Sequence, residues 1–254
     1  LFRFHPDNVH AKTVTFGRRI ERSKAVLALT RKSLAHQHPM LEQTLHGIHF
    51  PNPVGLSAGF DKSVELVPLV EAIGFGFITT GSVTGKTCDG NAKPWFHRKK
   101  KKKSLVVNVG LANQGSAAVA ERLHNDTRTA SRNVPLMISV ARTNDQSSST
   151  DEQAIEDYCT GLRNLREYPE LFEINISCPN TFGGEPFTDP ERLEKLLSAI
   201  DDLHLAQPIF VKMPSNKTWE ELDALLAVTV RHAVQGVTVC NLRKDRSGVN
   251  IDAS

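Results

Sequence analysis

The sequence of 254 residues lacks several features that would point to a specialised class of protein. Its four cysteines are widely spaced and form no CxxC pair, so neither a disulfide framework nor a zinc site is indicated. No run approaches the roughly 18 apolar residues of a membrane span, and no signal peptide is evident. The formal net charge is only +3, which does not indicate a nucleic-acid-binding protein. These absences favour an ordinary globular protein of a reducing compartment.

The chain is long enough for one large domain or two small ones, and its composition, 39% hydrophobic and 23% charged, is that of an ordinary globular protein. From residue 53 onward, short apolar runs alternate with helical patterns, which is typical of βα units and a parallel sheet. About six strands are predicted, at residues 54–58, 75–81, 136–141, 172–177, 209–213 and 236–241. The length permits a (β/α)8 barrel only if little of the chain is spent on extensions, since such a barrel needs about 250 residues.

The first 46 residues differ from the rest, because they are rich in Arg, Lys and His and poor in glycine. Their apolar residues recur at helical spacing, so we predict two short amphipathic helices here. Residues 47–254 are predicted to form the α/β part. Further helices are predicted at 193–203 and 218–230, and Thr188 followed by Glu191 fits a capping box at the start of the first of these.

Five consecutive lysines occupy residues 99–103. Extended segments at 95–98 and 105–109 flank this run, which predicts a hairpin inserted between barrel units with the lysines as its turn. A block of like charge is usually solvated, and that is the simplest interpretation of the run.

Polar residues gather where the predicted strands end, and in a parallel barrel this is the end that carries chemistry. Lysines and asparagines at these positions would be costly to bury without partners, and a purely structural account leaves the lysine charges unpaired. An anionic, planar ligand rich in heteroatoms would satisfy them. The residues concerned include Lys62, Asn175, Cys178, Asn180, Lys212 and Asn241.

Several segments together resemble the dihydroorotate dehydrogenases, flavin enzymes of pyrimidine synthesis. Residues 47–62 resemble the first-strand motif of this family, and residues 74–84 are similar to the second. Residues 91–94 and 108–113 resemble the hairpin that folds over the site, and residues 175–181 match the catalytic-loop motif. The leading residues 5–16 also resemble the N-terminal helices of the membrane-associated, quinone-using class.

The resemblance implies a (β/α)8 TIM barrel with an N-terminal helical extension, of which this chain holds about six of eight βα units. It implies oxidation of dihydroorotate to orotate, with FMN as hydride acceptor and a quinone as final acceptor, in pyrimidine (UMP) biosynthesis. Cys178 falls on the position of the catalytic base. The residues implied to contact FMN are Ala58, Gly59, Lys62, Ser82, Asn144, Asn175 and Lys212. Those implied to contact the substrate are Lys62, Asn113, Asn175, Asn180 and Asn241. No metal site is expected.

For residues 1–46, the resemblance implies an apolar tunnel through which quinone reaches the flavin, and peripheral contact with a membrane. The membrane would be the cytoplasmic side of the cell membrane, or the mitochondrial inner membrane in a eukaryote; otherwise the protein would be cytoplasmic. The alternative for this segment is an N-terminal packing arm. No nucleic-acid partner is expected.

The chain departs from the family pattern at three places. The quinone class usually has serine where this chain has Cys178, and the soluble class has cysteine; a thiol, with an ordinary pKa near 8.5, ionises far more readily than a hydroxyl. After the third strand, the asparagine expected to touch flavin is either displaced to Asn144 or replaced by Thr143. Asn241 is followed by Leu242, where the family has threonine. Either the wall of the substrate site is altered, or this segment is wrongly aligned with the family motif.

The largest departure is in length. The last two βα units, whose loops bind the FMN phosphate in the family, are not expected within 254 residues, so we expect a truncated sequence and an open barrel prone to aggregation. Three alternatives stay open. One is a soluble fumarate- or NAD-linked dihydroorotate dehydrogenase, and another is an inactive barrel fragment or basic interaction module. The third is a tRNA dihydrouridine synthase, whose cysteine has a similar Asn-x-x-Cys-Pro setting and whose RNA phosphates the lysine run could meet.

Overall fold

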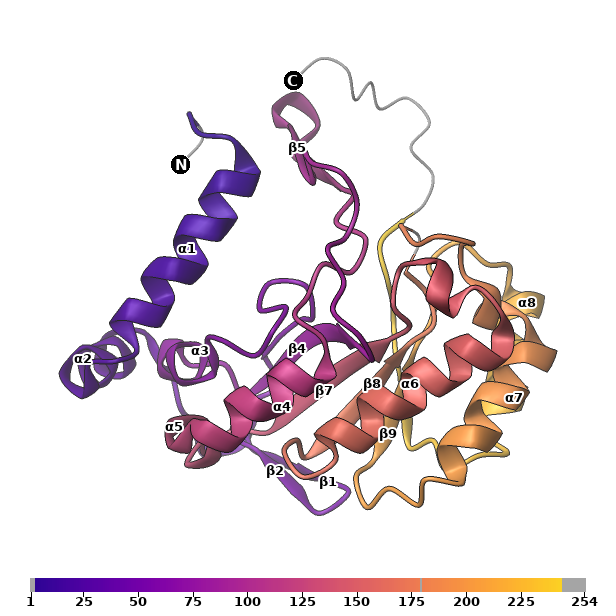
Figure 1. Cartoon of the computed structure of the whole chain (residues 1–254). Helices are drawn as coiled ribbons and strands as arrows, with labels where there is room; N and C mark the ends of the chain where they lie inside the picture. The colour runs from indigo at the N-terminus through magenta and orange to yellow at the C-terminus, as the bar shows by residue number, and fades with distance from the viewer. Residues whose placement is uncertain (1–2, 179, 244–254) are drawn as a thin grey trace.

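The computed structural model describes residues 3–178 and 180–243 and is built around a six-stranded parallel sheet (Figure 1). The strand order is β3-β4-β7-β8-β9-β10. All six predicted strands are confirmed, with bounds β3 (Gly55–Leu56), β4 (Phe77–Thr84), β7 (Leu136–Ala141), β8 (Leu171–Asn175), β9 (Ile209–Lys212) and β10 (Gly236–Thr238).

Helices alternate with these strands and cover the outside of the sheet (Figure 1). They are α3 (Val67–Ile73), α4 (Ser116–Asn125), α5 (Thr127–Ala130), α6 (Asp151–Leu165), α7 (Pro190–Asp201) and α8 (Trp219–Thr229). Parallel strands in sequential order with helices on one side are the arrangement of a (β/α)8 barrel, of which this sheet forms part. The predicted fold class is therefore confirmed.

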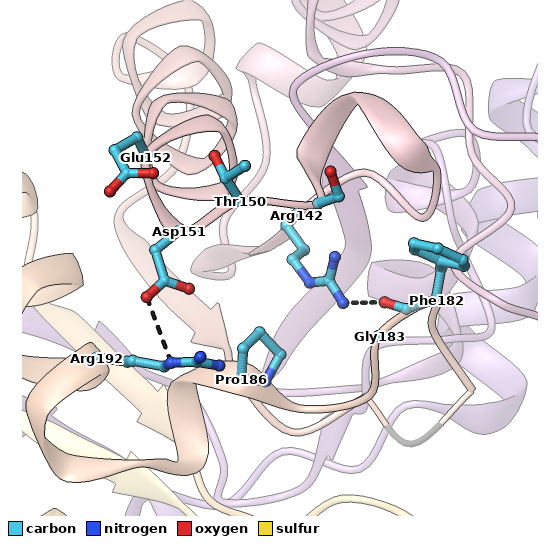
Figure 2. A pocket seen from close by; sticks show the side chains of 9 residues that line it. Arg142, Thr150, Asp151, Glu152, Phe182, Gly183, Pro186 and Arg192 are labelled. Atoms are coloured by element: carbon cyan, nitrogen blue, oxygen red, sulfur yellow. Dashed lines mark hydrogen bonds and ion pairs between the residues drawn. The ribbon is translucent and has the colours of Figure 1, made fainter.

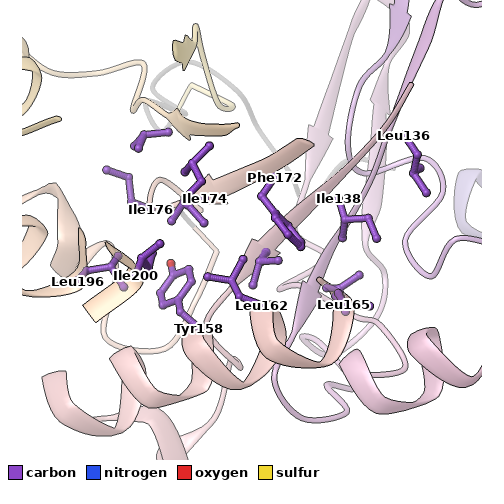
Figure 3. Packing of buried hydrophobic residues seen from close by; sticks show 14 of the residues in the cluster. Leu136, Ile138, Tyr158, Leu162, Leu165, Phe172, Ile174, Ile176, Leu196 and Ile200 are labelled. Atoms are coloured by element: carbon purple, nitrogen blue, oxygen red, sulfur yellow. The ribbon is translucent and has the colours of Figure 1, made fainter. Parts of the chain in front are cut away.

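The core lies between the sheet and its helices (Figure 3). Strands β7 and β8 are buried along their whole length, which agrees with the continuous apolar runs typical of parallel strands. Phe172 and Ile174 of β8 pack near Tyr158 and Leu162 of α6 (Figure 3). The Tyr158 hydroxyl donates to the backbone oxygen of Asn175 at 2.8 Å. This packing fixes the carboxyl end of β8, where the predicted catalytic loop begins.

The N-terminal segment forms the two predicted helices, α1 (Pro6–Ile20) and α2 (Lys24–Leu34). Gly17 of α1 is buried, and a Cβ there would lie 2.8 Å from the side chain of Leu66, so α1 packs closely on this leucine and a larger residue would require its side chain to shift. Phe16 and Leu29 remain exposed, at 64% and 65%. Among the described residues, none of the helices is both long and apolar enough to pass through a bilayer.

Two hairpins lie outside the sheet. The predicted lysine hairpin is confirmed as β5 (Phe96–Lys99) and β6 (Ser104–Val107), joined by the 3-10 turn η2 (Lys100–Lys102). A second hairpin, β1 (Gln43–Leu45) with β2 (Ile48–Phe50), follows the 3-10 turn η1 (Pro39–Leu41) and was not predicted. It crosses the proposed boundary between residues 46 and 47, and the division into two domains stays a prediction.

The predicted capping box at Thr188 is wrong. The N-cap of α7 is Asp189, whose carboxylate accepts from the backbone N–H of Arg192 at 3.1 Å. Pro190 fits the first helical position because it needs no hydrogen-bond partner for its nitrogen. Thr188 instead closes the 3-10 turn η4 (Pro186–Thr188). The predicted helix at 218–230 is confirmed as α8.

Candidate active site at the carboxyl ends of the strands

Three of the predicted site residues form one hydrogen-bond network at the strand ends. Asn175 at the end of β8 donates through Nδ2 to Ser82 Oγ of β4 at 2.7 Å. Asn241, which follows β10, donates through Nδ2 to Asn175 Oδ1 at 3.1 Å. Ser82 Oγ also lies 2.8 Å from Ser139 Oγ of β7. The parallel sheet thus brings together side chains from four strands or their ends.

Ser177 extends this network and was not singled out from the sequence. Its hydroxyl donates to the backbone oxygen of Lys212 at 2.8 Å and lies 3.2 Å from Asn241 Nδ2. Ser177 is fully buried, so its hydroxyl fixes the spacing between the ends of β8 and β9. Its place inside the catalytic-loop motif was the only sequence signal for this role.

Lys212 is paired, which corrects the expectation that the lysine charges are left without partners. Its Nζ lies 3.3 Å from Glu173 Oε1, and both side chains are buried. The register of β8 and β9 sets Asn175 opposite Lys212, and Glu173 lies two residues earlier on the same face of β8. The pair keeps a fixed cation at the strand ends without leaving it uncompensated.

Lys62, in the loop after β3, is held differently. Its Nζ donates to the backbone oxygen of Gly59 at 2.8 Å and lies 5.6 Å from the centre of the Phe96 ring. Among the described residues it forms no ion pair with a carboxylate. Burial lowers the pKa of Lys62 to about 8, although Asp61 and Asp7 oppose this shift. Its charge is therefore close to titrating near neutral pH.

His10 of α1 touches this lysine and was not identified from the sequence. Its Nε2 lies 2.9 Å from the backbone oxygen of Phe60 and 3.4 Å from Lys62 Nζ. A carbonyl oxygen can only accept, so Nε2 carries the hydrogen and donates to Phe60. Burial, and next the neighbouring Lys62, lower the pKa of His10. The N-terminal helix thus contributes a neutral imidazole to the edge of the site.

The backbone at Ala58 and Gly59 leaves room for a flat ligand. Gly59 has a φ of +110°, which favours glycine, and its N–H donates to the Gly81 oxygen at 2.8 Å. A Cβ added at Gly59 would meet no atom within 4 Å. Ala58 beside it is half-buried. This open face next to Lys62 is the kind of surface on which a planar ring system can lie.

Cys178 opens the loop after β8 and is partly exposed. Burial raises the pKa of its thiol to about 11, and the cations of Lys212 and Arg142 only partly oppose this. The thiol is therefore harder to ionise than the ordinary cysteine assumed from the sequence. Thr181 closes the loop, because its hydroxyl lies 3.1 Å from the Cys178 oxygen and 2.7 Å from the Gly184 oxygen. Residue 179 of the motif lies outside the described residues.

Arg142 and Asn144, which follow β7, hold both backbone groups of Phe182 in this loop, and Figure 2 shows the contact of Arg142 with the Phe182 oxygen. The buried guanidinium of Arg142 donates to the Phe182 oxygen and also to the Gly184 oxygen at 3.2 Å. Asn144 Oδ1 accepts from the Phe182 N–H at 2.5 Å. Arg142 was not singled out from the sequence, and it clamps the loop that carries Cys178.

A cavity of about 280 Å³ adjoins this clamp (Figure 2). Arg142 and Phe182 line it together with the start of α6, where Asp151 pairs with Arg192 at 3.3 Å. None of the predicted FMN-contacting or substrate-contacting residues lines this cavity. Its walls carry both signs of charge, so it shows no preference for an anionic ligand.

Asn144 and Asn180 join the loops to the lysine hairpin. Asn144 Nδ2 donates to the backbone oxygen of Gly110 at 3.0 Å and to Asn91 Oδ1 at 3.2 Å. Asn180 Nδ2 donates to the backbone oxygen of Val107 at 3.1 Å. These contacts hold the base of the hairpin over the strand ends. A direct role of either asparagine in binding flavin or substrate stays a prediction.

Asn113 lies under the hairpin and is buried. Its Nδ2 donates to Thr84 Oγ1 at 2.8 Å and to the Leu111 oxygen at 2.7 Å, and its Oδ1 accepts from the Gly115 N–H at 2.8 Å. Its amide therefore braces the end of β4 against the segment that leads into α4. Its predicted contact with substrate stays a prediction.

Across residues 3–178 and 180–243, no cluster of three or more His, Cys, Asp or Glu side chains could hold a metal ion. The chemistry available at the strand ends is that of two lysines, a thiol, an imidazole, and a set of amides and hydroxyls, together with the carboxylate of Glu173 and the guanidinium of Arg142.

Comparison with known sequences identifies relatives over most of the chain. A dihydroorotate dehydrogenase from Synechococcus sp. (strain JA-3-3Ab), of the quinone type by name, is 34% identical over 223 residues, which make up 87% of this chain and 58% of the relative. One of the same name from Chloroflexus aurantiacus is 31% identical over 258 residues, covering 98% of this chain and 69% of the relative. The chain thus spans only about 58% of the length of some of these relatives.

Solved structures agree on the fold. A dihydroorotate dehydrogenase from Eimeria tenella in complex with ferulenol superposes with a TM-score of 0.78 at 23% identity, over 96% of this chain and 68% of that one. Its ligand-free form gives a TM-score of 0.79. A sequence model of the family described as dihydroorotate dehydrogenase matches residues 40–254. This chain belongs to the dihydroorotate dehydrogenase family.

Proposed function

We propose that this chain supplies the ring-facing and substrate-facing part of a dihydroorotate dehydrogenase. The reaction is oxidation of dihydroorotate to orotate in pyrimidine (UMP) biosynthesis, with FMN as hydride acceptor and a quinone as final acceptor. The observation that carries the proposal is the network of Ser82, Asn175 and Asn241 at the strand ends, beside Cys178 and the cation of Lys212. Family membership and the names of the relatives support it.

The residues present fit the ring of FMN. Gly59 offers open backbone, and the cations of Lys62 and Lys212 can offset negative charge that develops on a reduced ring. Ser82 and Asn175 add hydroxyl and amide groups that match ring heteroatoms. When bound, FMN would take the hydride that leaves C6 of dihydroorotate.

Cys178 is proposed as the base that removes the C5 proton of dihydroorotate. With a pKa of about 11, only about one thiol in 10⁴ is ionised at pH 7. The rate of substrate oxidation should therefore rise with pH until the thiol titrates. Asn113, Asn180 and Asn241 are proposed to orient the substrate through their amides, and positioning of this kind is a major part of catalysis.

We further propose that α1 and α2 contact a bilayer and admit quinone to the flavin, as the resemblance implied. Their exposed apolar side chains support this, since Phe16, Val26 and Leu29 are 64%, 40% and 65% exposed. The protein would then lie at the cytoplasmic side of the cell membrane, or at the mitochondrial inner membrane in a eukaryote. A packing arm would instead require a partner that covers these side chains.

The test begins with the flavin absorbance of the purified chain, since a colourless protein that takes up no added FMN would remove the proposal. Anaerobic stopped-flow mixing with dihydroorotate then follows bleaching of the flavin. Cys178→Ala should slow this step by roughly 10² to 10⁴-fold, the usual contribution of a general base. Cys240→Ala, which removes an exposed thiol, is the matched control and should leave the rate unchanged. An unchanged rate in Cys178→Ala would exclude this cysteine as the base.

The acceptor is identified by reoxidation of the dihydroorotate-reduced protein. A soluble quinone analogue should restore the oxidised spectrum faster than fumarate or NAD. Faster reoxidation by fumarate or NAD would instead assign the chain to the soluble class that Cys178 resembles.

A further inference from the structure

The tip of the β5–β6 hairpin, residues 99–103, concentrates the positive charge of the chain. Lys100, Lys101, Lys102 and Lys103 are all exposed, and in Figure 1 the hairpin projects away from the sheet. The chain has 31 basic and 28 acidic residues, so without these five lysines it would have 26 against 28, a net charge of −2. These five consecutive lysines carry a formal charge that exceeds the net charge of +3 of the whole chain.

Exposed apolar side chains adjoin the lysine tip. Leu105 of β6 is 50% exposed and lies opposite Arg98 in the hairpin register. The Arg98 guanidinium donates to the backbone oxygen of Phe4 at 2.9 Å, and the Phe4 side chain is 63% exposed. The cations thus border two apolar groups that come from different parts of the chain.

The hairpin is fastened to α1 as well as to the barrel. Both carboxylate oxygens of Asp7 accept backbone hydrogen bonds, from Trp95 at 2.9 Å and from Phe96 at 3.0 Å. The lysine tip and the N-terminal end of α1 therefore form one surface, and they lie at the same end of the molecule in Figure 1.

We propose that this surface binds anionic phospholipid headgroups of a bilayer, with Phe4 and Leu105 entering the interface beside the lysines. Lysines near an anionic bilayer contribute about 1 kcal/mol each, which is roughly fivefold in affinity per residue. Apolar side chains next to cations are the pattern of interfacial membrane binding. RNA phosphates would also attract lysines, and a base could stack on the ring of Phe4, but the exposed aliphatic side chain of Leu105 is buried by a bilayer interface and not by RNA, so the patch favours a bilayer. The site is separate from the flavin and substrate residues, and it extends the proposed function by holding the protein where quinone dissolves.

The experiment measures cosedimentation of the whole chain with vesicles, without substrate. Binding to phosphatidylcholine–phosphatidylglycerol vesicles should exceed binding to pure phosphatidylcholine and should weaken with salt. The triple variant Lys100→Ser, Lys101→Ser, Lys103→Ser should bind roughly 100-fold more weakly. The matched control Arg163→Ser, Arg166→Ser, Lys195→Ser removes three exposed cations from α6, its C-cap and α7, and should bind as the unaltered chain does. Leu105→Ser should weaken binding to a smaller extent, and at all salt concentrations.

Equal binding by the triple variant and its control would overturn the proposal, and so would tighter binding to a single-stranded RNA than to anionic vesicles at the same salt. Dihydroorotate-dependent flavin bleaching, measured in parallel, separates the two proposals. Bleaching by a triple variant that has lost vesicle binding supports both. Vesicle binding by a chain that shows no bleaching supports the lipid site and counts against the proposed function.

Discussion

Lys62 and Lys212 both lie at the carboxyl ends of strands, yet the two lysines are held in opposite ways. Lys212 belongs to β9 and is buried beside the carboxylate of Glu173. Lys62 belongs to a loop and donates to the carbonyl of Gly59, and burial lowers its pKa to about 8. One lysine therefore has its counter-charge built into the sheet, whereas the other is a cation whose protonation depends on its surroundings.

The difference indicates that mutations will act differently on the two sides of the site, the strand side around Lys212 and the loop side around Lys62. The strand side is set by the register of β8 and β9, which pairs Asn175 with Lys212 and leaves little freedom. The loop side is bounded by His10 of α1, so movement of the N-terminal helix changes the surroundings of Lys62. We expect mutations on the strand side to act mainly on stability and those on the loop side to act on the protonation of Lys62.

The largest effect is expected when the strand-side pair is broken. Glu173→Gln leaves the ammonium of Lys212 buried without a counter-charge, which should lower the free energy of unfolding by about 3–5 kcal/mol. Urea denaturation followed by circular dichroism measures the change. The double variant Glu173→Gln, Lys212→Met removes both charges and should recover much of the loss. If Glu173→Gln alone is as stable as the parent, the pair does not neutralise Lys212.

The next effect concerns the charge of Lys62. A shift in pKa from 10.5 to about 8 corresponds to about 3.4 kcal/mol, and residual solvent exposure reduces this to about 2 kcal/mol. Between pH 8 and 10.5 the unfolded chain holds this proton and the folded chain does not, so stability should rise with pH in that window. Lys62→Met should be about 2 kcal/mol more stable than the parent at pH 7, and the two should converge near pH 10.5.

Urea midpoints of the two proteins across this pH range provide the measurement. The difference between them isolates Lys62 from the tyrosines and cysteines that titrate in the same range. A constant difference at all pH values would mean that the pKa of Lys62 is not lowered in the folded protein.

The contrast between the two lysines also shows what could be predicted from the sequence. The six strands were predictable because buried parallel strands are short apolar runs, and the lysine turn because extended segments flank it. The pairing of Lys212 with Glu173 was not, because it depends on the register between β8 and β9. The contact of His10 with Lys62 joins α1 to a loop 52 residues further on, and no local pattern encodes it.

Two local features were missed for different reasons. Strands β1 and β2 have three residues each and no buried residue, so they lack the apolar run that marks a strand. Asp189 and not Thr188 caps α7, because Pro190 disfavours a helical conformation in the residue before it, so Asp189 is extended and the helix begins at Pro190. Likewise, Ser177 donates to a backbone carbonyl at the end of β9 and Arg142 to one in the loop after β8, and only the folded chain brings these groups close.

A smaller effect on stability is expected when the contact between α1 and the β5–β6 hairpin is broken. Asp7→Ala removes the acceptors of the Trp95 and Phe96 N–H groups, and this should cost about 1–2 kcal/mol locally. Hydrogen exchange of these amides, read by mass spectrometry of the hairpin peptides, should accelerate, while the amides of β7 and β8 keep their protection. Asp151→Ala, at the start of α6, is the control on the strand side. Equal acceleration in β8 would show that α1 supports the sheet as a whole.

The smallest expected effect is on the pKa of Lys62 in variants of His10. It distinguishes two ways in which α1 can act on this lysine. If burial by α1 lowers the pKa of Lys62, then His10→Phe should leave it near 8, because a ring of similar size still excludes water. His10→Ala should admit water and raise the pKa toward 10.5. Both variants lose the hydrogen bond to the Phe60 oxygen, worth about 1 kcal/mol, so the loss of this bond is common to both and cannot explain unequal shifts in the pKa of Lys62. The titration midpoint of the Lys62 ε-carbon by NMR is the measurement. Equal upward shifts in both variants would show that the imidazole itself, not burial, sets the charge of Lys62.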